Sequence, residues 1–536
     1  MSLKKPQLLA TGALFIGSVY ATSVYKHFST PPPPVYDATI IGGGVVGLSV
    51  AQNLSNRGHK VLLLEASPHL ASGASSGNSG LGCTGYDAPP GSLERRLLRL
   101  SSSLHQNLYR SFGLSHDHVR KTGSLVVAWT KQELTSLPSV LSENVAAGDT
   151  DAVLLSQSEL LDLEPGISPS ALGAVYCPRE AVVEPWLVPA CYAAAAKANG
   201  ATIKTSEPVA DLAFDSEMKM WAVTTEPTSP PPASSPYVPP IFLKMKEDLY
   251  KSSPPPPSPS SPPLATYLSR CVINCAGLYG DEIEKLSGNP PPPAPHSPFT
   301  ITPRKGQFVV FSPSPSSTSS PSSPPLPTAI IEPIATAITK GVIAWTTVYG
   351  NIIVGPTAVD QESKTDRSTD AETIDMLRAK GAAMIPALKT AEVVGTYSGL
   401  RPSSNHRDYQ IYPNPDRRWI TVGGIRSTGL TGSSGIGEYV GNLYDSLDGD
   451  TPPPLPASGS APDGLVPVTE AATSPLPHTP RGRDPLPPVP NLAALSEDFV
   501  KRGDGTVMLH GSPMFVTHPL SSFGMSTYQK NKRAAQ

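Results

Sequence analysis

The sequence predicts an α/β protein whose ordered segments are interrupted by stretches rich in proline and serine. Three observations support this prediction. A β-forming run, Ala38 to Ile41, breaks into glycines and is followed by a helical pattern. Apolar strands and amphipathic helices then alternate to about residue 448. Proline accounts for 63 of the 536 residues, against an average share of about 5%, and most of it is confined to a few tracts.

The first element is a strand, turn and helix with a G-x-G-x-x-G spacing at Gly42, Gly44 and Gly47. The first glycine permits a tight turn, the second lets backbone N–H groups approach a pyrophosphate, and the third lets the helix pack on the strand. The positive end of the helix dipole would face the same anion. A second strand, Val61 to Leu64, ends at Glu65, where an acid is expected to bind a ribose hydroxyl. This context predicts a Rossmann-like dinucleotide-binding unit.

Length and charge limit the classes of function. A chain of 536 residues is long enough for two or three domains and a large core. A net charge of −3 argues against a nucleic-acid partner held by phosphate attraction. The five cysteines form no C-x-x-C pair, so we expect neither a metal site nor a disulfide framework.

The N-terminal segment, residues 1–35, contains lysines but no acidic residue. Its moderately apolar run, Leu8 to Tyr25, is close to the length of about 20 residues that crosses a bilayer. A membrane span, a mitochondrial targeting segment and a secretory signal stay open as interpretations. Pro31 to Pro34 then form a stiff spacer. We expect a mitochondrial or membrane-anchored protein, with membrane association through this segment.

The ordered elements that follow are predicted from their periodicity. A loop of small and hydroxyl residues at 72–85 would leave room for a flat ligand. The predicted helices are 93–109, 189–198, 368–384 and 435–443, and the predicted strands include 123–129, 201–203, 209–214, 271–275, 351–354, 393–400 and 419–424.

The Pro/Ser-rich tracts are predicted to be disordered. They cover 225–265 and 312–327, and they lack the apolar residues needed for packing. Such insertions are tolerated because the closure entropy of a loop grows slowly with its length. A Pro-rich, poorly ordered tail is expected over 449–536.

With these segments in order, the sequence resembles the FAD-dependent oxidoreductases of the D-amino-acid oxidase/glycerol-3-phosphate dehydrogenase superfamily. The motifs are most similar to those of the A subunit of anaerobic glycerol-3-phosphate dehydrogenase and of L-2-hydroxyglutarate dehydrogenase. The matching stretches are IIGGGVVGLSVAQNL, SSGNSG, PGSLERRL, VINCAGLYGDEI, PRKGQFVVF, NIIVGPTA, YSGLRPSSN and VGGIRSTGLT.

The resemblance implies a Rossmann-like FAD-binding domain joined to an α+β substrate domain built on a mostly antiparallel sheet. Residues 36–448 would form this unit. The FAD-binding parts would be about 36–110, 186–224, 266–289 and 395–445, and the substrate parts about 111–185 and 298–394.

The resemblance also implies the cofactor-binding residues. They are the fingerprint positions, the loop along the pyrophosphate and flavin, a strand facing the adenine, a second turn, and a C-terminal loop facing the flavin. In this sequence the residues are Gly42, Gly44, Val45, Val46, Gly47, Glu65, Ala66, Ser72, Asn78, Ser79, Val209, Ala276, Gly277, Gly424, Gly429, Leu430 and Thr431.

Arg401 is the residue that we expect to bind substrate. Its position resembles that of the arginine that grips a carboxylate or phosphate in this superfamily, and a guanidinium fork suits either anion. Arg304 and Lys305 would add positive charge, and Arg426 lies in the flavin loop.

Two departures from the family pattern affect the proton acceptor. Cys83 and Tyr349 stand where close relatives usually carry histidine. Tyr349 could donate a hydrogen bond but is a poor base near neutral pH. His406, shortly after Arg401, is the best remaining candidate for the base.

The sequence therefore predicts an enzyme that uses FAD to oxidise a C–OH bond in a small anionic substrate. Glycerol 3-phosphate is the first candidate, followed by a 2-hydroxy acid, and an amino-acid oxidase is a further alternative. The electron acceptor would be a quinone or oxygen. The missing histidines also permit a second hypothesis, a flavin-binding scaffold whose catalysis has decayed.

Overall fold

The computed structural model describes residues 34–228, 264–312, 326–334, 341–449, 455 and 486–535. The N-terminal segment, most of the two Pro/Ser-rich insertions and most of the Pro-rich tract after residue 449 lie outside the described residues, so the predictions made for them stay predictions. Among the described residues, no helix combines the length and the apolar character that crossing a bilayer requires.

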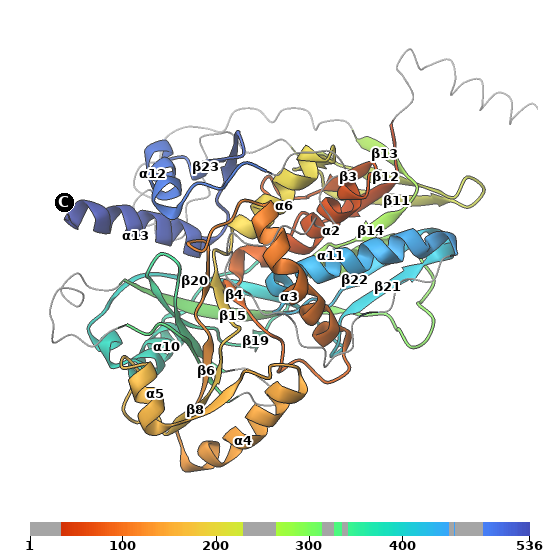
Figure 1. The fold of residues 1–536 in the computed structure, drawn as a ribbon. Helices are drawn as coiled ribbons and strands as arrows, with labels where there is room; N and C mark the ends of the chain where they lie inside the picture. Colours follow the sequence, from red (N-terminus) through yellow and green to blue (C-terminus); the bar gives the residue numbers. More distant parts are fainter. Residues whose placement is uncertain are drawn as a thin grey trace, which may run out of the picture.

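A six-stranded sheet forms the first half of the fold (Figure 1). Its five parallel strands read as nearly continuous apolar runs because both faces are covered. The order is β10 (Thr202–Lys204), β3 (Val61–Leu64), β2 (Ala38–Ile41), β14 (Val272–Asn274), β22 (Trp419–Gly423) and the antiparallel β21 (Gln410–Asn414).

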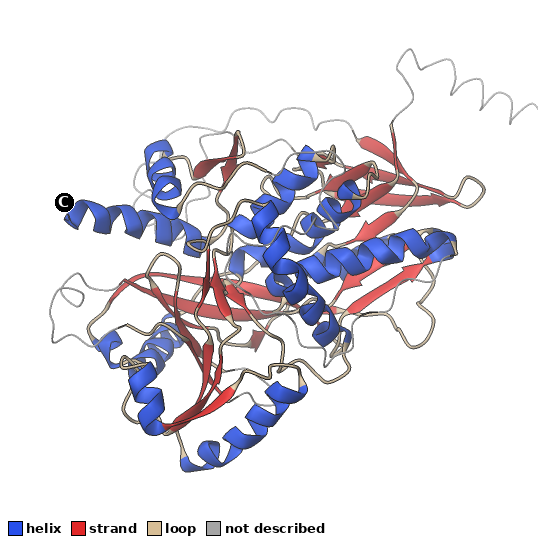
Figure 2. Ribbon diagram, in the orientation of Figure 1, coloured by secondary structure: helices blue, strands red, loops and turns tan. Residues whose placement is uncertain are grey.

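Helices cover one face of this sheet and a small sheet covers the other (Figure 2). The helices are α2 (Val45–Asn56), α6 (Leu187–Ala198) and α11 (Gly429–Asp445), with α3 (Leu93–Ser111) packed on α11. The covering sheet has the order β1 (Val35–Tyr36), β13 (Ala265–Ser269), β12 (Met220–Thr225) and β11 (Val209–Asp215).

Small residues let α11 approach its two neighbours closely. A Cβ on Gly435 would lie 2.4 Å from the carbonyl oxygen of Leu97 in α3, and one on Gly437 would lie 2.4 Å from Oγ of Ser49 in α2. These three helices therefore pack closely together, and the start of α11 lies beside the start of α2.

A nine-stranded sheet forms the second half, and it is antiparallel except for the pair β16/β6. The order is β19 (Val359–Asp360), β15 (Ile301–Ser312), β18 (Ile352–Gly355), β17 (Ile343–Thr346), β16 (Ile330–Pro333), β6 (Ser124–Ala128), β8 (Gly173–Cys177) and β7 (Val153–Ser156), with β20 (Glu392–Ser404) paired to β15. Its helices are α4 (Lys131–Ala146), α5 (Gln157–Leu163) and α10 (Ala371–Met384). The predicted α/β fold with a mostly antiparallel second sheet is confirmed.

Three short strands and one helix complete the connections. The strands β4 (Leu81–Gly82), β9 (Ala181–Val183) and β5 (Val119–Lys121) form a small sheet, and α8 (Gly280–Leu286) follows β14.

The first insertion leaves and rejoins the fold at adjacent positions. Thr225 ends β12, Ala265 begins β13, and the two residues are cross-strand partners. The ends of the inserted chain are thus held together by the sheet, so residues can be added there without separating any packed elements.

Two predicted boundaries are wrong. Residues 395–404 belong to β20 and so to the second sheet, because they pair residue by residue with residues 301–310 of β15. The predicted poorly ordered tail is folded from Leu486 onward, in α12 (Leu492–Arg502), the hairpin β23 (Thr506–Leu509) and β24 (Ser512–Phe515), and α13 (Pro519–Ala535).

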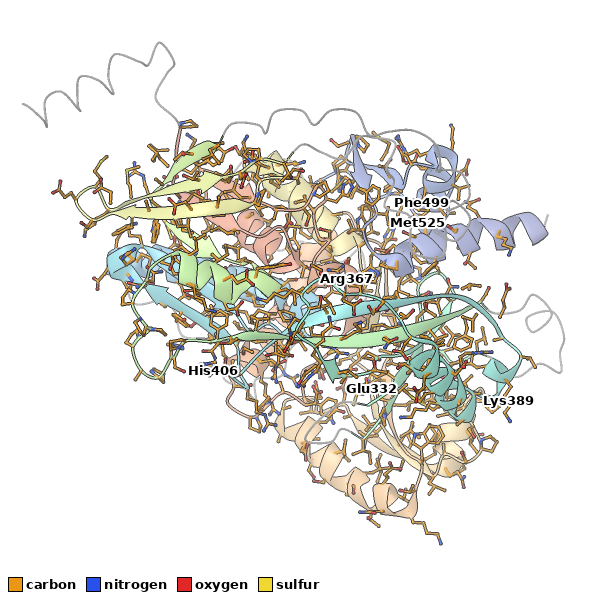
Figure 3. The ribbon with its side chains drawn as sticks, turned by 180° about the vertical axis from the view of Figure 1, so that it is seen from behind. Glu332, Arg367, Lys389, His406, Phe499 and Met525 are labelled. Atoms are coloured by element: carbon orange, nitrogen blue, oxygen red, sulfur yellow. The ribbon has the colours of Figure 1, made fainter. Side chains whose placement is uncertain are left out.

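We call residues 486–535 the C-terminal module. It buries Leu495, Val507 and Met525, and Phe499 and Met525 lie at the contact between α12 and α13 (Figure 3). Leu492, Leu495 and Phe499 follow helical spacing, which the surrounding Pro-rich composition obscured.

Candidate active site

A cavity of about 1040 Å³ runs from the ends of the parallel strands to the second sheet. Most of the predicted site residues line it, although they come from separate parts of the sequence. The lining includes Gly42, Gly44, Val45, Val46, Glu65, Ala66, Ser72, Asn78, Ser79, Val209, Ala276, Gly277, Arg304, Arg401, Gly424, Gly429 and Leu430.

Steric contacts explain the glycines of the first turn. Gly42 has a φ of +110°, and a Cβ there would lie 2.4 Å from the carbonyl oxygen of Cys275. A Cβ on Gly47 would lie 2.0 Å from the carbonyl oxygen of Gly42. Gly47 therefore sits behind the cavity wall and lets α2 start directly against β2, with the N-terminus of α2 facing the cavity.

Glu65 ends β3 at the cavity wall. Its Oε2 accepts a hydrogen bond from the Gly43 N–H at 2.7 Å, and its Oε1 accepts one from the Ser67 N–H at 2.8 Å. The carboxylate thus ties the glycine turn to the next strand, at the position where the sequence predicts a ribose contact.

The loop from Ala71 to Asn78, which we call the cofactor loop, lies along the same cavity. The Val45 N–H donates to Ser75 Oγ at 2.9 Å. Arg367, which also lines the cavity, donates from Nη1 to the Ser72 carbonyl at 2.8 Å and to Ser76 Oγ at 2.7 Å.

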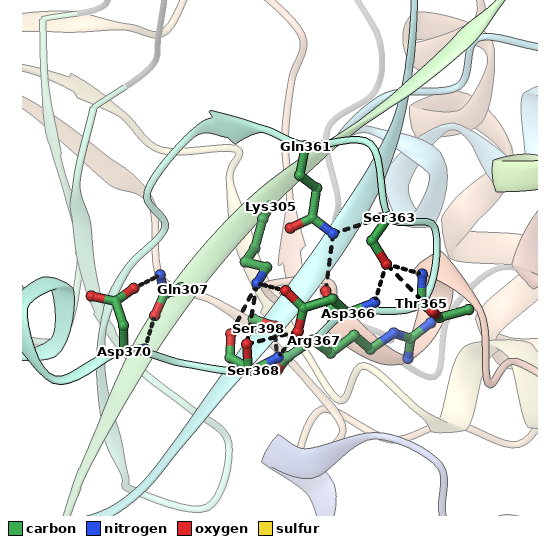
Figure 4. A network of polar contacts seen from close by, with 10 residues as sticks. All are labelled: Lys305, Gln307, Gln361, Ser363, Thr365, Asp366, Arg367, Ser368, Asp370 and Ser398. Carbon is green, nitrogen blue, oxygen red and sulfur yellow. Dashed lines mark hydrogen bonds and ion pairs between the residues drawn. The ribbon is translucent and has the colours of Figure 1, made fainter.

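The segment that carries Arg367 is anchored to the second sheet (Figure 4). Lys305 Nζ lies 2.6 Å from Asp366 Oδ2, and Ser398 Oγ donates to the Arg367 carbonyl at 2.7 Å. The second sheet therefore supports the cofactor loop from one side.

The loop from Gly424 to Thr428, which we call the C-terminal loop, reaches the cavity directly before α11 begins. Gly424 has a φ of +68°, and Thr428 Oγ1 donates to Glu94 at 2.7 Å just before the helix begins. Gly429 and Leu430 line the cavity, whereas Thr431 is buried beneath it. Thr431 Oγ1 donates to the Leu81 carbonyl at 3.1 Å, so its contact is with β4.

Two arginines face each other across paired strands at the other end of the cavity. Arg304 in β15 and Arg401 in β20 are cross-strand partners, and both line the cavity. Like charges placed directly opposite one another destabilise a sheet, so this pair is typical of an anion site.

Neighbouring groups fix both guanidiniums. Arg304 makes two hydrogen bonds to Asp360, at 2.6 and 2.9 Å, and this pair raises the pKa of Arg304. Arg401 Nη2 donates to the Thr357 carbonyl at 3.0 Å. A Cβ on Gly306 would lie 2.6 Å from that nitrogen, so glycine makes the room for it.

Burial, and then the charge of Arg304, lower the pKa of Arg401 to about 10. Arg401 is therefore still a cation at neutral pH. Lys364 and Arg407 also line the cavity and were not predicted as site residues; only their position in the fold identifies them.

Besides Gly47 and Thr431, three more of the predicted site residues do not line the cavity. Lys305 follows Arg304 in β15 and so points to the opposite face, where it pairs with Asp366. His406 Nε2 lies 3.1 Å from the Pro298 carbonyl oxygen on the outer surface (Figure 3).

Tyr349 is buried in the core, and its hydroxyl donates to Glu184 Oε1 at 3.3 Å. Its burial raises its pKa well above the ordinary value. The structure therefore contradicts direct catalytic roles for His406 and Tyr349, and a direct substrate contact by Lys305.

No histidine lines the cavity in the part of the chain that the structure describes. Cys83, Asp87 and Glu94 are titratable groups that do line it. Glu94 is held by Thr428 and by Arg426, the latter at 3.2 Å. Among the described residues there is also no cluster of three metal-binding side chains.

This arrangement fits FAD. Gly42 and Gly44 line the cavity wall at the start of α2, and the N-termini of α2 and α11 face the same cavity. Four parts of the cavity wall could together hold an extended dinucleotide with its ring end near the arginines. They are the fingerprint, the Ser72–Ser79 stretch, Val209 and the C-terminal loop.

Comparisons with known proteins agree with this fit. The model of the family described as FAD-dependent oxidoreductase matches residues 37–443. The chain is 26% identical over 414 residues to a glycerol 3-phosphate dehydrogenase of Caloramator mitchellensis, covering 77% of this chain and 74% of that one.

It is also 27% identical over 409 residues to a glycerol 3-phosphate oxidase of Mycoplasma pneumoniae, covering 75% and 92% of the two chains. The solved structure of the L-α-glycerophosphate oxidase of that organism, with FAD bound, superimposes with a TM-score of 0.62 at 25% identity, covering 77% and 95%. A mitochondrial L-2-hydroxyglutarate dehydrogenase of Caenorhabditis elegans is 26% identical over 297 residues, covering 54% and 58%.

Proposed function

The chain belongs to the family of FAD-dependent oxidoreductases, and we propose that it oxidises a C–OH bond in a small anionic substrate, with glycerol 3-phosphate as the first candidate. The family match shows that the protein is an enzyme that uses FAD. The identity of the substrate is our proposal.

The observation that carries the proposal is the pair of arginines at the end of the cavity. Two guanidiniums on adjacent strands match a group with more than one anionic oxygen, as phosphate has. The similarity to glycerol 3-phosphate dehydrogenase and oxidase supports the same substrate.

Each residue has a defined task in this proposal. Bound FAD supplies the two-electron acceptor. Arg401 binds the anion and thereby fixes the position of the reacting carbon, which removes much of the entropic barrier. Asp360 holds the Arg304 fork in one orientation. The N-terminus of α11 places N–H groups where negative charge would develop.

The hydroxyl proton needs an acceptor on the cavity wall. Asp87 and Glu94 are two carboxylates on that wall. The variants Asp87→Asn and Glu94→Gln test which carboxylate accepts the proton. The variant that lacks the acceptor should reduce its flavin slowly, while its substrate affinity stays nearly unchanged.

Anaerobic reduction of the bound flavin tests the substrate. The purified enzyme is mixed with glycerol 3-phosphate, glycerol, L-2-hydroxyglutarate, other 2-hydroxy acids and amino acids, and bleaching of the visible absorbance is followed. We expect rapid bleaching with glycerol 3-phosphate and none with glycerol, which lacks the anion. Rapid bleaching by a different compound would replace the proposed substrate.

A 2-hydroxy acid is the second candidate, favoured by the similarity to L-2-hydroxyglutarate dehydrogenase and by the fit of a carboxylate to the same arginines. Retention of FAD with no bleaching by any member of the panel would support the decayed scaffold instead.

The electron acceptor is tested by adding oxygen or a soluble quinone to the reduced enzyme. Fast reoxidation by oxygen would identify an oxidase. A mitochondrial location remains our proposal, supported by the names of several relatives, and subcellular fractionation checks it.

A further inference from the structure

We propose that the C-terminal module is a structural part of the cofactor site: it holds the cofactor loop in its FAD-binding conformation, with His518 as the positioning residue. This module lies outside residues 37–443, the span that matches the family. Its role therefore comes from the contacts that this chain makes.

The central contact joins His518 to the cofactor loop. His518 is 1% exposed, and its Nε2 lies 3.0 Å from the carbonyl oxygen of Asn78, a residue of the cavity wall. Its Nδ1 accepts a hydrogen bond from the Leu520 N–H at 3.2 Å. An Nδ1 that accepts requires the proton on Nε2, so His518 donates to Asn78.

Burial supports this protonation state, because it lowers the pKa of His518 to about 3. The neutral ring then has one donor and one acceptor, and the structure uses both. The Tyr397 hydroxyl donates to the same Asn78 carbonyl at 3.3 Å. The end of the cofactor loop is thus fixed jointly by the second sheet and by the C-terminal module.

A second contact holds the beginning of the loop. Ala71 has a φ of +55°, which residues with a side chain rarely adopt. The Ala71 N–H donates to the Gly43 carbonyl at 2.9 Å, and the Ala71 carbonyl accepts from Thr517 Oγ1 at 3.3 Å. The preceding His69 ring stacks on Phe515 at a centroid distance of 4.0 Å. The module therefore supports a backbone conformation that is intrinsically unfavourable.

The module is itself anchored to the rest of the fold. The Trp186 indole N–H donates to the Phe515 carbonyl at 2.9 Å, and the Val489 N–H donates to the Gly113 carbonyl at 3.0 Å. A Cβ on Gly524 would lie 2.1 Å from the ring of Tyr349. These contacts place the start of α13 firmly against the body, so His518 can act on the loop.

The cofactor loop thus lies between two supports. Arg367 holds Ser72 and Ser76 from the second sheet, and the module holds Ala71 and Asn78. Because FAD and the module contact the same loop, each should stabilise the conformation that the other requires.

The test measures FAD affinity by flavin fluorescence after reconstitution of the full-length apoprotein. His518→Leu removes the donor, and His518→Asn keeps an acceptor for Leu520 but cannot reach Asn78. We expect both to weaken FAD binding about tenfold, from loss of a buried hydrogen bond. His518→Gln places a donor near the position of Nε2 and should restore affinity to within about threefold.

The matched control is His510→Asn, in the turn between β23 and β24, where Nε2 of the histidine makes no hydrogen bond and asparagine tolerates the positive φ of +48°. It should leave FAD affinity unchanged. A second readout uses the natural sequence: FAD should slow proteolytic cleavage within the C-terminal module, by the reciprocity of the coupling.

Unchanged FAD affinity in His518→Leu would overturn the proposal. So would equal losses in His518→Leu and His518→Gln, since these would mean that the ring matters only for packing. If the His518 variants do not fold, Thr517→Val replaces them. Its expected effect is about a threefold loss of affinity, and an unchanged value contradicts the proposal.

Discussion

The two ends of the cavity are lined by different kinds of chemical group. The cofactor end consists of backbone groups and small residues, and Gly42 and Gly47 leave no room for even a methyl group. The substrate end consists of charged side chains on two paired strands, with Arg304 and Arg401 as neighbours. In the proposed function, one end would recognise FAD through its shape and its N–H groups, and the other would recognise the substrate through charge.

The difference predicts how each end responds to substitution. A steric site fails almost completely when one atom is added, because the clash is with backbone. A site made of several cations should lose affinity in steps as individual charges are removed. A single substitution should therefore abolish binding at the cofactor end but only weaken it at the substrate end.

The largest expected effect is that of Gly47→Ala. The new Cβ would lie 2.0 Å from the Gly42 carbonyl oxygen, so α2 must move away from β2. We expect a protein that retains no FAD on gel filtration, measured by the ratio of visible to ultraviolet absorbance. Gly280→Ala, where the nearest atoms lie 3.7 Å away, should retain a full complement of FAD.

The next effect concerns the connection between the two halves. Arg99 of α3 and Asp149, which follows α4, form a buried ion pair with N–O distances of 2.8 Å. Arg99→Met leaves a buried carboxylate without its partner, which should lower the free energy of unfolding by about 3–5 kcal/mol. Urea unfolding measures it.

The double variant Arg99→Met/Asp149→Leu provides the control, because it removes both charges and should recover much of the loss. Equal stability of the single and double variants would show that the charge itself has little effect.

Arg304→Gln tests the gradual response of the substrate end. With Arg401 still present, kcat/KM for the reducing substrate should fall about 10- to 100-fold, while FAD content stays normal. Arg378→Gln serves as the control, because Arg378 is an exposed residue of α10 that pairs with Asp375. Loss of FAD from Arg304→Gln would contradict the proposal that Arg304 serves only the substrate end.

The smallest effect is expected from pH, and it should separate the two ends. Burial lowers the pKa of His105, in α3, to about 4. The unfolded chain binds this proton below about pH 6.5, so stability should fall as the pH drops from there towards 4. At about pH 5.5 this single group accounts for about 1 kcal/mol, measured as the difference in pH dependence between the natural protein and His105→Leu.

The substrate end should not share this pH dependence. Burial lowers the pKa of Arg401 only to about 10, so its guanidinium stays a cation between pH 4 and pH 8. The contribution of Arg401 to substrate affinity should therefore stay constant in this range, as measured by titration with substrate at each pH.

The cofactor end could be predicted from the sequence because its information is local. Gly42, Gly44 and Gly47 fall within six residues of sequence, and Glu65 directly follows the next strand. The substrate end depends on which strands pair. Arg401 was found by resemblance, but its neighbour could be chosen between Arg304 and Lys305 only when the register of β15 and β20 was known.

The failures have related causes. His406 was favoured by its closeness to Arg401 in sequence, yet it lies beyond the end of β20, where the chain turns outward. Tyr349 was considered because it stands where close relatives usually carry histidine, but the C-terminal module packs on it, with Gly524 against its ring. No local pattern could reveal contacts with a segment about 170 residues further on.

The hairpin formed by β12 and β13 offers a practical opportunity. Thr225 and Ala265 are cross-strand partners, so a foreign domain with neighbouring termini could be grafted between them without redesigning the scaffold. A ligand-responsive graft at this junction would lie on the sheet whose edge strand, β11, begins at Val209 on the cavity wall. Flavin fluorescence could then report whether the grafted domain has bound its ligand, and the enzyme would serve as the scaffold of a biosensor.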